Sequence, residues 1–192
     1  LSSVIYLLYF VQYFLRSYGF IGHFVQSLNV ARRNMEITAI VLNNCVYGMT
    51  GGQLSATTPP ETKTATSPYG HLESPFDICE LARVAGSIFV ARSTVYHVKL
   101  MDKLISKALE KRGFSVLEIL AQCPVQYGRR AGFSSAVEMM KWQKDNTVTI
   151  EKAKKLSQEE LQDKIRIGVL VNREAPSYQQ RLERSKKKAR AL

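Results

Sequence analysis

The sequence predicts an α/β fold in which a parallel sheet is covered by helices. Three short apolar runs, at 37–42, 87–91 and 114–120, have the length and the β-branched residues of buried strands. Helical patterns lie between them, and the connections are short. Strands that alternate with helices in this way form a parallel sheet, because each helix crosses over from one strand to the next.

The first half of the chain contains clear element boundaries. A helix is predicted over 24–34, and its basic last turn suits the negative end of the helix dipole. Residues 48–70 are rich in Gly, Thr, Ser and Pro, which predicts a long loop of the kind that is usually functional. Ser74 is the predicted N-cap of the next helix, with Asp77 at its third position and Gly86 as its left-handed end.

The second half continues the alternation. Residues 97–112 carry apolar side chains at helical spacing, which predicts an amphipathic helix that Gly113 ends. The other predicted elements are a helix over 134–144, a capping box at Ser157 and Glu160, a peripheral strand over 165–171 and a basic terminal helix over 177–190.

Composition places the chain among ordinary globular domains. Its 192 residues are 45% hydrophobic, which is ample for a core and too apolar for a disordered chain. Three widely spaced cysteines, Cys45, Cys79 and Cys123, exclude a disulfide scaffold and fit a reducing compartment. The net charge of +11 invites a nucleic-acid hypothesis. We reject it, because no stacking platform or known nucleic-acid module accompanies the charge.

The two ends of the chain differ from its middle. Residues 151–192 contain 12 Lys and Arg against 6 Asp and Glu, so the basic charge is concentrated in the tail, which is interpreted as a solvated helix. Residues 1–15 are apolar or aromatic at 12 of 15 positions, and no acidic residue precedes Glu36. Such a run is shorter than the roughly 20 residues of a membrane span. It is either a misread or fragmentary start, or a buried or membrane-contacting segment; we expect no membrane association.

Candidate functional residues follow two predicted strands. Ligands of open parallel sheets bind outside the carboxyl ends of the strands. The stretch Asn43 to Gln53 leaves the strand 37–42, and Cys123 follows the strand 114–120. Since neighbouring parallel strands end at one edge, the two stretches can face one site.

The first stretch has the chemistry of a diphosphate and magnesium site. Glycines allow backbone N–H groups to approach phosphate oxygens, and an Asn side-chain oxygen together with a backbone carbonyl suits Mg²⁺. A plain turn is the alternative, because Asn-Asn and Gly-Gly are common turn residues. Cys123, like Cys45 and Cys79, is by itself best interpreted as a small buried hydrophobe. The three histidines share no metal-ligand spacing.

Longer stretches resemble the β subunit of 2-oxoacid:ferredoxin oxidoreductases, and the 2-oxoglutarate type most of all. The resemblance covers about residues 31–180, and the double Asn followed by YGMTGGQ is its most specific motif. The matching stretches are ARRN, ITAIVLNNCVYGMTGGQLSATTP, TKTATSPYG, PFDICELARVAGSIFVAR, GFSVLEIL, QCPVQYGRRAGF and DKIRIGVLVNREAPSY.

The resemblance implies a partial thiamine diphosphate-binding fold and an oxidative decarboxylation. A 2-oxoacid loses CO₂, its acyl group passes to coenzyme A, and electrons pass singly through an iron–sulfur cluster to ferredoxin. It implies an α subunit as partner and a cytoplasmic enzyme. By the same resemblance Asn44 and the Val46 carbonyl are magnesium ligands and Cys123 is a cluster ligand. The implied cofactor-binding residues are Asn44, Val46, Tyr47, Gly48, Met49, Thr50, Gly51, Gly52 and Gln53.

The sequence departs from this family at two motifs. The family's magnesium site begins with Gly-Asp-Gly, which would fall near Ser17, where this chain has Leu-Arg-Ser-Tyr-Gly. The family also has a CxxC pair and a further cysteine near its start, whereas no cysteine precedes Cys45 here. One thiolate does not hold a 4Fe–4S cluster. We therefore expect weak cofactor binding and no cluster in this chain.

The predicted organisation has three parts: an atypical apolar segment 1–30, a thiamine diphosphate-binding α/β domain 31–150 and a basic extension 151–192. The leading functional hypothesis is the β subunit of a 2-oxoglutarate-type oxidoreductase. The alternative is an inactive fragment, or a non-catalytic interaction subunit of the same fold whose basic terminal helix engages an acidic partner.

Overall fold

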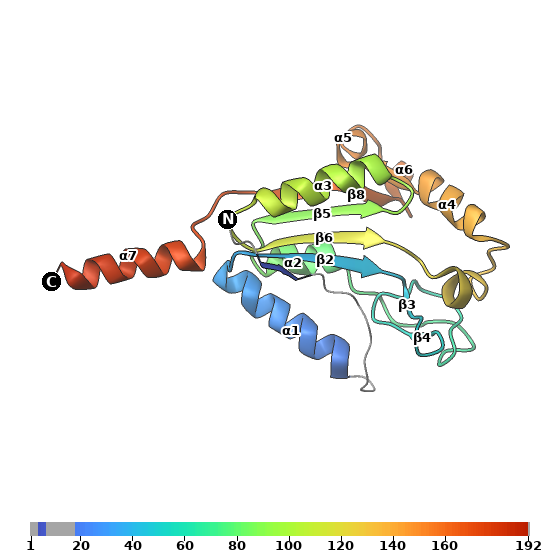
Figure 1. Ribbon diagram of the computed structural model, residues 1–192. Coiled ribbons are helices and arrows are strands. Elements are labelled where there is room, and N and C mark those ends of the chain that lie inside the picture. The colour runs from blue at the N-terminus through green and yellow to red at the C-terminus, as the bar shows by residue number, and fades with distance from the viewer. Residues whose placement is uncertain (1–3, 7–17, 192) are drawn as a thin grey trace.

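A computed structural model describes residues 4–6 and 18–191 of the chain. In these residues one large sheet has the strand order β1-β2-β6-β5-β8-β7, and two short strands form the separate hairpin β3-β4. Figure 1 shows helices on both sides of the large sheet. The strands are β1 (Val4–Tyr6), β2 (Ile37–Asn43), β3 (Val46–Tyr47), β4 (Gln53–Leu54), β5 (Phe89–Thr94), β6 (Ser115–Leu120), β7 (Thr147–Thr149) and β8 (Ile165–Asn172).

The predicted α/β class with a parallel sheet is confirmed for the strands β1, β2, β6 and β5, which run parallel to one another. Strand β8 differs, because it pairs antiparallel with β5, while β7 pairs parallel with β8. The prediction that 165–171 lies at the periphery is wrong. The edge belongs to β7, whose three residues are too few to show a strand pattern in the sequence.

The helices form two layers around the sheet (Figure 1). Helices α1 (Tyr18–Arg33) and α2 (Ile78–Val84) cover one face, and α3 (Val98–Glu110) covers the other. The apolar stripe predicted for 97–112 is buried against the sheet at Leu104 and Ala108. Coverage of both faces explains why the central strands have nearly continuous apolar sequences.

The core is divided between these two faces. Cys79 of α2 packs with Val116 of β6, and Leu104 of α3 packs with Leu117. Successive residues of a strand point to opposite faces. The alternation therefore places Glu118 on the same face as Val116, among apolar side chains under α2.

Helix α2 begins later than predicted. Its N-cap is Asp77, whose carboxylate accepts a hydrogen bond from the backbone N–H three residues later at 2.9 Å. The prediction of Ser74 as the N-cap is therefore wrong. Aspartate caps as well as serine does, and Asp77 gains a second partner in Arg92 at 2.6 Å. Gly86 ends the helix with φ +101, the left-handed conformation expected there.

The C-terminal half adds short elements around the sheet edge. The capping box predicted at Ser157 and Glu160 is confirmed. The elements are a π-helical turn η1 (Pro124–Gly128), α4 (Ala136–Asp145), α5 (Ile150–Ala153), α6 (Gln158–Leu161) and α7 (Tyr178–Arg190). None of the helices in the described part of the chain has the length and apolar character needed to cross a membrane.

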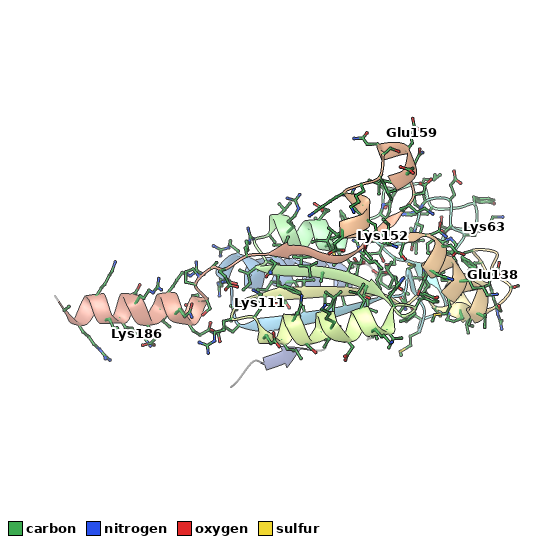
Figure 2. The ribbon with its side chains drawn as sticks, turned by 90° about the horizontal axis from the view of Figure 1, so that it is seen from above. Lys63, Lys111, Glu138, Lys152, Glu159 and Lys186 are labelled. Atoms are coloured by element: carbon green, nitrogen blue, oxygen red, sulfur yellow. The ribbon has the colours of Figure 1, made fainter. Side chains whose placement is uncertain are left out.

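The basic helix α7 projects away from the sheet, at the end opposite to β3 and β4 (Figure 1). Figure 2 shows Lys186 on this helix and Lys63 and Glu138 at the other end of the molecule. The predicted terminal helix is thus confirmed. Its charge lies far from the carboxyl ends of the parallel strands, so it does not define the site predicted there.

Asn34 joins three distant segments just after α1. Its Oδ1 accepts a hydrogen bond from the Phe114 N–H at 2.8 Å, and its Nδ2 donates to the carbonyls of Ala175 and Pro176 at 3.2 and 3.1 Å. Its backbone carbonyl accepts from the Tyr178 N–H at 3.0 Å. Asn34 is buried and has φ 51, a conformation that asparagine tolerates better than most residues.

The start of α7 should be sensitive to loss of its cap. Ser177 is buried, accepts from the Gln180 N–H and donates to Oε1 of Glu36 at 2.7 Å. We expect Ser177→Ala to lower the free energy of unfolding by about 1–2 kcal/mol, measured by urea denaturation. Ser185→Ala, on the exposed part of the same helix, is the control and should cost nothing. Equal effects of the two changes would contradict the capping role.

Part of the predicted organisation lies outside the described residues. The segment 1–30 includes residues 1–3 and 7–17, and the position near Ser17 where the family has Gly-Asp-Gly belongs to them. Within the described part, β1 pairs with β2 over three residues. The division of the chain at residues 30 and 150 stays a prediction.

Candidate functional site

A pocket of about 480 Å³ lies at the carboxyl ends of β2 and β6, at the sheet edge where the sequence places a ligand site. The residues that line it are Val41, Leu42, Asn43, Asn44, Val46, Tyr47, Gly48, Met49, Ser55, Thr57, Ile78, Ala121 and Cys123. Six of the predicted residues are among them: Asn44, Val46, Tyr47, Gly48, Met49 and Cys123. The other four, Thr50, Gly51, Gly52 and Gln53, form the turn that follows.

The two stretches predicted to face one site do lie together. The Cys123 N–H donates to the Asn44 carbonyl at 3.3 Å. A Cβ atom on Gly48 would lie 3.3 Å from Nδ2 of Asn44 and 3.4 Å from Sγ of Cys123. The absence of a side chain at Gly48 therefore keeps this part of the pocket open between the amide and the thiol.

The turn that carries Asn44 is held on both sides. Cys45 has φ +64, a left-handed conformation that costs energy for a residue other than glycine. Its N–H donates to Oδ1 of Asn43 at 3.1 Å, and its carbonyl accepts from the Thr58 hydroxyl at 2.7 Å. These contacts fix the backbone between Asn43 and Val46, the segment that holds both predicted magnesium ligands.

The glycine-rich stretch forms a tight turn beside the pocket. The Gly52 N–H donates to the Tyr47 carbonyl at 2.9 Å, which closes the turn. Gly51 and Gly52 have φ +115 and +83, values that only glycine adopts without strain. Gln53 donates from Nε2 to the Thr50 carbonyl at 2.5 Å and shares a further bond with its hydroxyl. Rigid backbone of this kind can present N–H groups to phosphate oxygens.

The long Thr-rich loop folds back onto this turn. The Thr57 hydroxyl donates to Oδ1 of Asn43 at 2.9 Å, and the Thr66 hydroxyl accepts from the Leu54 N–H at 3.0 Å. The Ala65 N–H donates to the Gly52 carbonyl at 2.9 Å. Thr57 and Thr66 therefore have a structural role, because their hydroxyl groups attach the loop to the strand end and the turn that form the site.

The described lining of the pocket is neutral. None of its thirteen lining residues is acidic or basic, and burial raises the pKa of Tyr47, which keeps that phenol protonated. Neutral oxygens are available from the Asn44 side chain and the backbone. Such donors suit a magnesium ion whose charge is balanced by the phosphates of its ligand. The donor set therefore fits the diphosphate end of a nucleotide-like cofactor.

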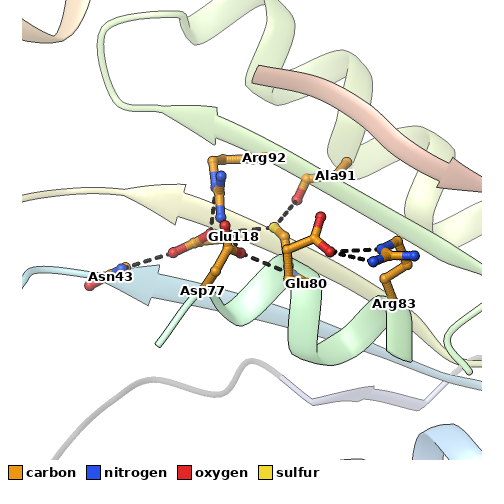
Figure 3. A network of polar contacts seen from close by, with 8 residues as sticks. Asn43, Asp77, Glu80, Arg83, Ala91, Arg92 and Glu118 are labelled. Atoms are coloured by element: carbon orange, nitrogen blue, oxygen red, sulfur yellow. Dashed lines mark hydrogen bonds and ion pairs between the residues drawn. The ribbon is translucent and has the colours of Figure 1, made fainter. Parts of the chain in front are cut away.

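An ionic cluster lies on the α2 face of the sheet (Figure 3). Asp77, Cys79 and Glu118 each place one ligand atom within 4.8 Å of the others. Arg92 already supplies a cation there, because its Nε binds Oε2 of Glu118 at 2.7 Å and its Nη2 binds Asp77 at 2.6 Å. Burial lowers the pKa of Arg92, but the nearby acidic groups, Glu118 foremost, raise it more. The cluster is therefore an ion-pair network rather than a metal site.

The cysteines of this chain do not fit an iron–sulfur cluster. Burial, followed by the charge of Glu118, raises the pKa of Cys45 to about 12 and that of Cys79 well above its ordinary value. Both thiols are neutral and point into packed regions, whereas metal ligation needs thiolates. Cys123 alone is partly exposed at the pocket, and its Sγ accepts a bond from the Gln126 N–H at 3.4 Å.

This difference predicts selective thiol labelling. At pH 8 iodoacetamide should modify Cys123 in the native chain and leave Cys45 and Cys79 unmodified, because they are buried and remain protonated far above that pH. Peptide mass spectrometry measures the three sites separately. In urea all three should react. Native labelling of Cys45 at the rate seen for Cys123 would contradict the packing described above.

Sequence reasoning missed Glu118 and Arg92. Both are charged residues inside otherwise apolar strand patterns, and this was the available signal. A charge within a buried strand is rare unless it is paired. Glu118 is 2% exposed, and its pairing with Arg92 on the neighbouring strand follows from the register of β5 and β6.

Residues 18–119 match the family described as "Thiamine pyrophosphate enzyme, C-terminal TPP binding domain". Thiamine pyrophosphate is the thiamine diphosphate named above. The match covers more than half of the chain, and the chain belongs to this family. The expected resemblance to 2-oxoacid:ferredoxin oxidoreductase β subunits is also confirmed by the named relatives that follow.

Two relatives are both named "2-oxoglutarate synthase subunit KorB". The protein of Methanocaldococcus jannaschii is 40% identical over 85% of this chain and 59% of its own length. The protein of Methanothermobacter thermautotrophicus is 45% identical over 76% of this chain and 51% of its own. The "2-oxoacid:ferredoxin oxidoreductase subunit beta" of Saccharolobus solfataricus is 39% identical over 54% of this chain and 33% of its own. The chain thus spans little more than half the length of the KorB relatives.

A solved structure has the same fold. It is a 2-oxoglutarate:ferredoxin oxidoreductase from Magnetococcus marinus with 2-oxoglutarate, coenzyme A and succinyl-CoA bound. The TM-score is 0.73 at 26% sequence identity, and the similarity covers 89% of this chain and 59% of that chain.

Proposed function

We propose that this chain is the cofactor-binding part of the β subunit of a 2-oxoacid:ferredoxin oxidoreductase, with 2-oxoglutarate as its substrate. The observation that carries the proposal is the neutral pocket at the ends of β2 and β6, where Asn44, Gly48 and Cys123 meet. Membership of the thiamine pyrophosphate family and the names of the relatives support it.

In this proposal Asn44 and the Val46 carbonyl hold Mg²⁺, and the turn from Tyr47 to Gln53 lies along the diphosphate. When bound, thiamine diphosphate supplies a carbon nucleophile that adds to the keto carbon of the 2-oxoacid and takes up the electrons left when CO₂ departs. The residues of this chain orient the diphosphate end. Met49, 72% exposed at the mouth of the pocket, lies where substrate and a partner subunit can reach it.

The remaining partners follow from the same proposal. An α subunit completes the site, coenzyme A accepts the acyl group, and ferredoxin accepts the electrons in a cytoplasmic enzyme. The cysteines of this chain provide one accessible thiol, Cys123, so no electron-transfer step is assigned to them. The missing carboxylate in the described pocket lining predicts weak binding of Mg²⁺ and thiamine diphosphate by the chain alone.

Calorimetric titration tests the proposal. Thiamine diphosphate should bind weakly in the presence of Mg²⁺ and release no heat when EDTA removes the metal. Asn44→Ala should lower the affinity at least about tenfold, because it removes a metal ligand. Asn172→Ala, an exposed change on β8, is the matched control and should bind as the unaltered chain does.

Two results would contradict the proposal: binding that is independent of Mg²⁺, or no binding even at millimolar cofactor. The second result would favour the non-catalytic interaction subunit. Substrate choice is measured separately in the assembled complex with its α subunit, by release of CO₂ from each 2-oxoacid, a readout that needs no iron–sulfur cluster in this chain. 2-Oxoglutarate should be decarboxylated in preference to pyruvate; the reverse preference would overturn the substrate assignment.

A further inference from the structure

Glu118 is a buried carboxylate with every oxygen in use. Oε1 accepts a hydrogen bond from Nδ2 of Asn43 at 2.8 Å. Oε2 accepts from Nε of Arg92 at 2.7 Å and from the Cys79 thiol at 3.3 Å. The residue lies in the middle of the network in Figure 3, between β2 and β5. An ionised carboxylate can only accept hydrogen bonds, so Glu118 determines which groups face it.

The orientation of the Asn43 amide follows from this. Its NH₂ group faces Glu118, and its oxygen therefore faces the opposite side, where two donors meet it. These are the Cys45 N–H at 3.1 Å and the Thr57 hydroxyl at 2.9 Å. A reversed amide would set NH₂ against the Cys45 N–H, which can only donate, whereas the Thr57 hydroxyl could turn to accept. The contacts that hold the backbone of Cys45 at φ +64 thus depend on a carboxylate one strand away.

Arg92 fixes the carboxylate in turn. The Arg92 side chain is 11% exposed, and its guanidinium bridges Glu118 to Asp77, the N-cap of α2. The Arg92 side chain comes from β5, Glu118 from β6 and Asn43 from β2. The network therefore links three neighbouring strands and one helix start to the turn that carries Asn44.

We propose that Glu118 is a positioning residue for the turn Asn44–Val46: it orients the Asn43 amide and thereby holds the two magnesium-ligating oxygens in place. The inference rests on the proposed function for the identity of the ion. The claim that Glu118 fixes the turn does not depend on the ion and rests on the hydrogen bonds alone.

Glu118→Gln is the direct test. The glutamine keeps the shape, but its single carbonyl is claimed by Arg92, so its NH₂ group opposes that of Asn43 and the amide of Asn43 reverses. Hydrogen exchange of the Cys45 amide should accelerate more than tenfold in the chain without cofactor. The Mg²⁺-dependent affinity for thiamine diphosphate should fall by about 10- to 100-fold, as for other partners of metal ligands.

The control is Leu117→Ala. Leu117 precedes Glu118 on the same strand, is fully buried and faces α3. The change destabilises the sheet without touching the Asn43 amide. It should therefore leave two quantities unchanged: the exchange rate of the Cys45 amide relative to the amides of β2, and the cofactor affinity. If Glu118→Gln resembles Leu117→Ala in both measurements, the positioning role is wrong.

A rescue variant gives a sharper result. In Glu118→Gln/Asn43→Asp the carboxylate moves to position 43, where it accepts from the NH₂ group of the introduced glutamine, from the Cys45 N–H and from Thr57. Slow exchange at Cys45 should return. Failure of the double variant to restore protection overturns the proposal.

A second double variant tests the proposal in a chain that is expected to fold. Arg92→Met/Glu118→Met removes both charges, which avoids an unpaired buried charge. It should fold, and it should still show fast Cys45 exchange because Asn43 has lost its acceptor; slow exchange would contradict the proposal. If the unaltered chain binds no cofactor, the proposed function fails, while the exchange measurements still decide whether Glu118 holds the turn.

Discussion

Replacing Asn34 with alanine is expected to lower the free energy of unfolding by about 3 kcal/mol. The change leaves the buried Phe114 N–H without an acceptor, and each such group costs about 1–3 kcal/mol. It also frees the carbonyls of Ala175 and Pro176 and puts alanine at φ 51. Because Asn34 connects α1, β6 and the segment before α7, the loss should appear in one cooperative transition.

Urea denaturation followed by circular dichroism measures this effect. Asn34→Gly removes the same hydrogen bonds but tolerates φ 51, so its cost should be smaller than that of alanine by the backbone strain alone. Asn172→Ala, which alters an exposed side chain, should change the stability by less than about 0.5 kcal/mol. A loss below about 1 kcal/mol for Asn34→Ala would show that the bond to Phe114 contributes nothing.

Gly52→Ala is expected to damage the candidate site more than any other glycine change in the turn. The new Cβ would lie 2.7 Å from Oε1 and 3.0 Å from Cβ of Gln126. The side-chain tip can move, but the Cβ of Gln126 is fixed by the π-helical turn. With φ +83 added, we expect a loss of about 3 kcal/mol in unfolding free energy and weaker Mg²⁺-dependent binding of thiamine diphosphate.

Gly132 offers a matched control for this change. It has φ +85, almost the same as Gly52, but a Cβ there would meet nothing within 4 Å. Gly132→Ala therefore measures the backbone strain alone, about 1 kcal/mol, and should leave cofactor titration unchanged. The difference between the two variants reports the contact with Gln126. If both cost the same, the packing of Gln126 against the turn is unimportant.

The fold was predictable wherever a pattern extended over several turns or a whole strand. The β-branched runs predicted β2 and β6, and the spacing of apolar residues predicted α3, because each of these elements is buried along its length. The start of α2 was not predictable in the same way. Ser74 and Asp77 are both good caps. The choice between them depends on Arg92, which lies on another strand and is not part of the local sequence around the helix start.

The candidate site, like the fold, was predictable only in part. Asn44, Gly48 and Cys123 lie on stretches that were expected to face one site because parallel strands end at one edge, and the structure brings them together at the pocket. Their individual roles were implied by the resemblance to the oxidoreductase β subunits. The polar support behind them was not predicted. Nothing local in the sequence says that Glu118 meets Asn43 from the neighbouring strand, since such a contact depends on the register of β2 and β6.

The position of β8 has a consequence for the order in which the chain folds on the ribosome. The outer edge of β5 is covered by β8, which is made more than 70 residues later in the 192-residue sequence. Until residues 165–172 emerge, the nascent chain presents β5 as an unpaired edge whose first half, Phe89 to Ala91, is apolar. Exposed edges of this kind recruit other strands. Interrupted synthesis therefore leaves this edge open to pairing with other chains.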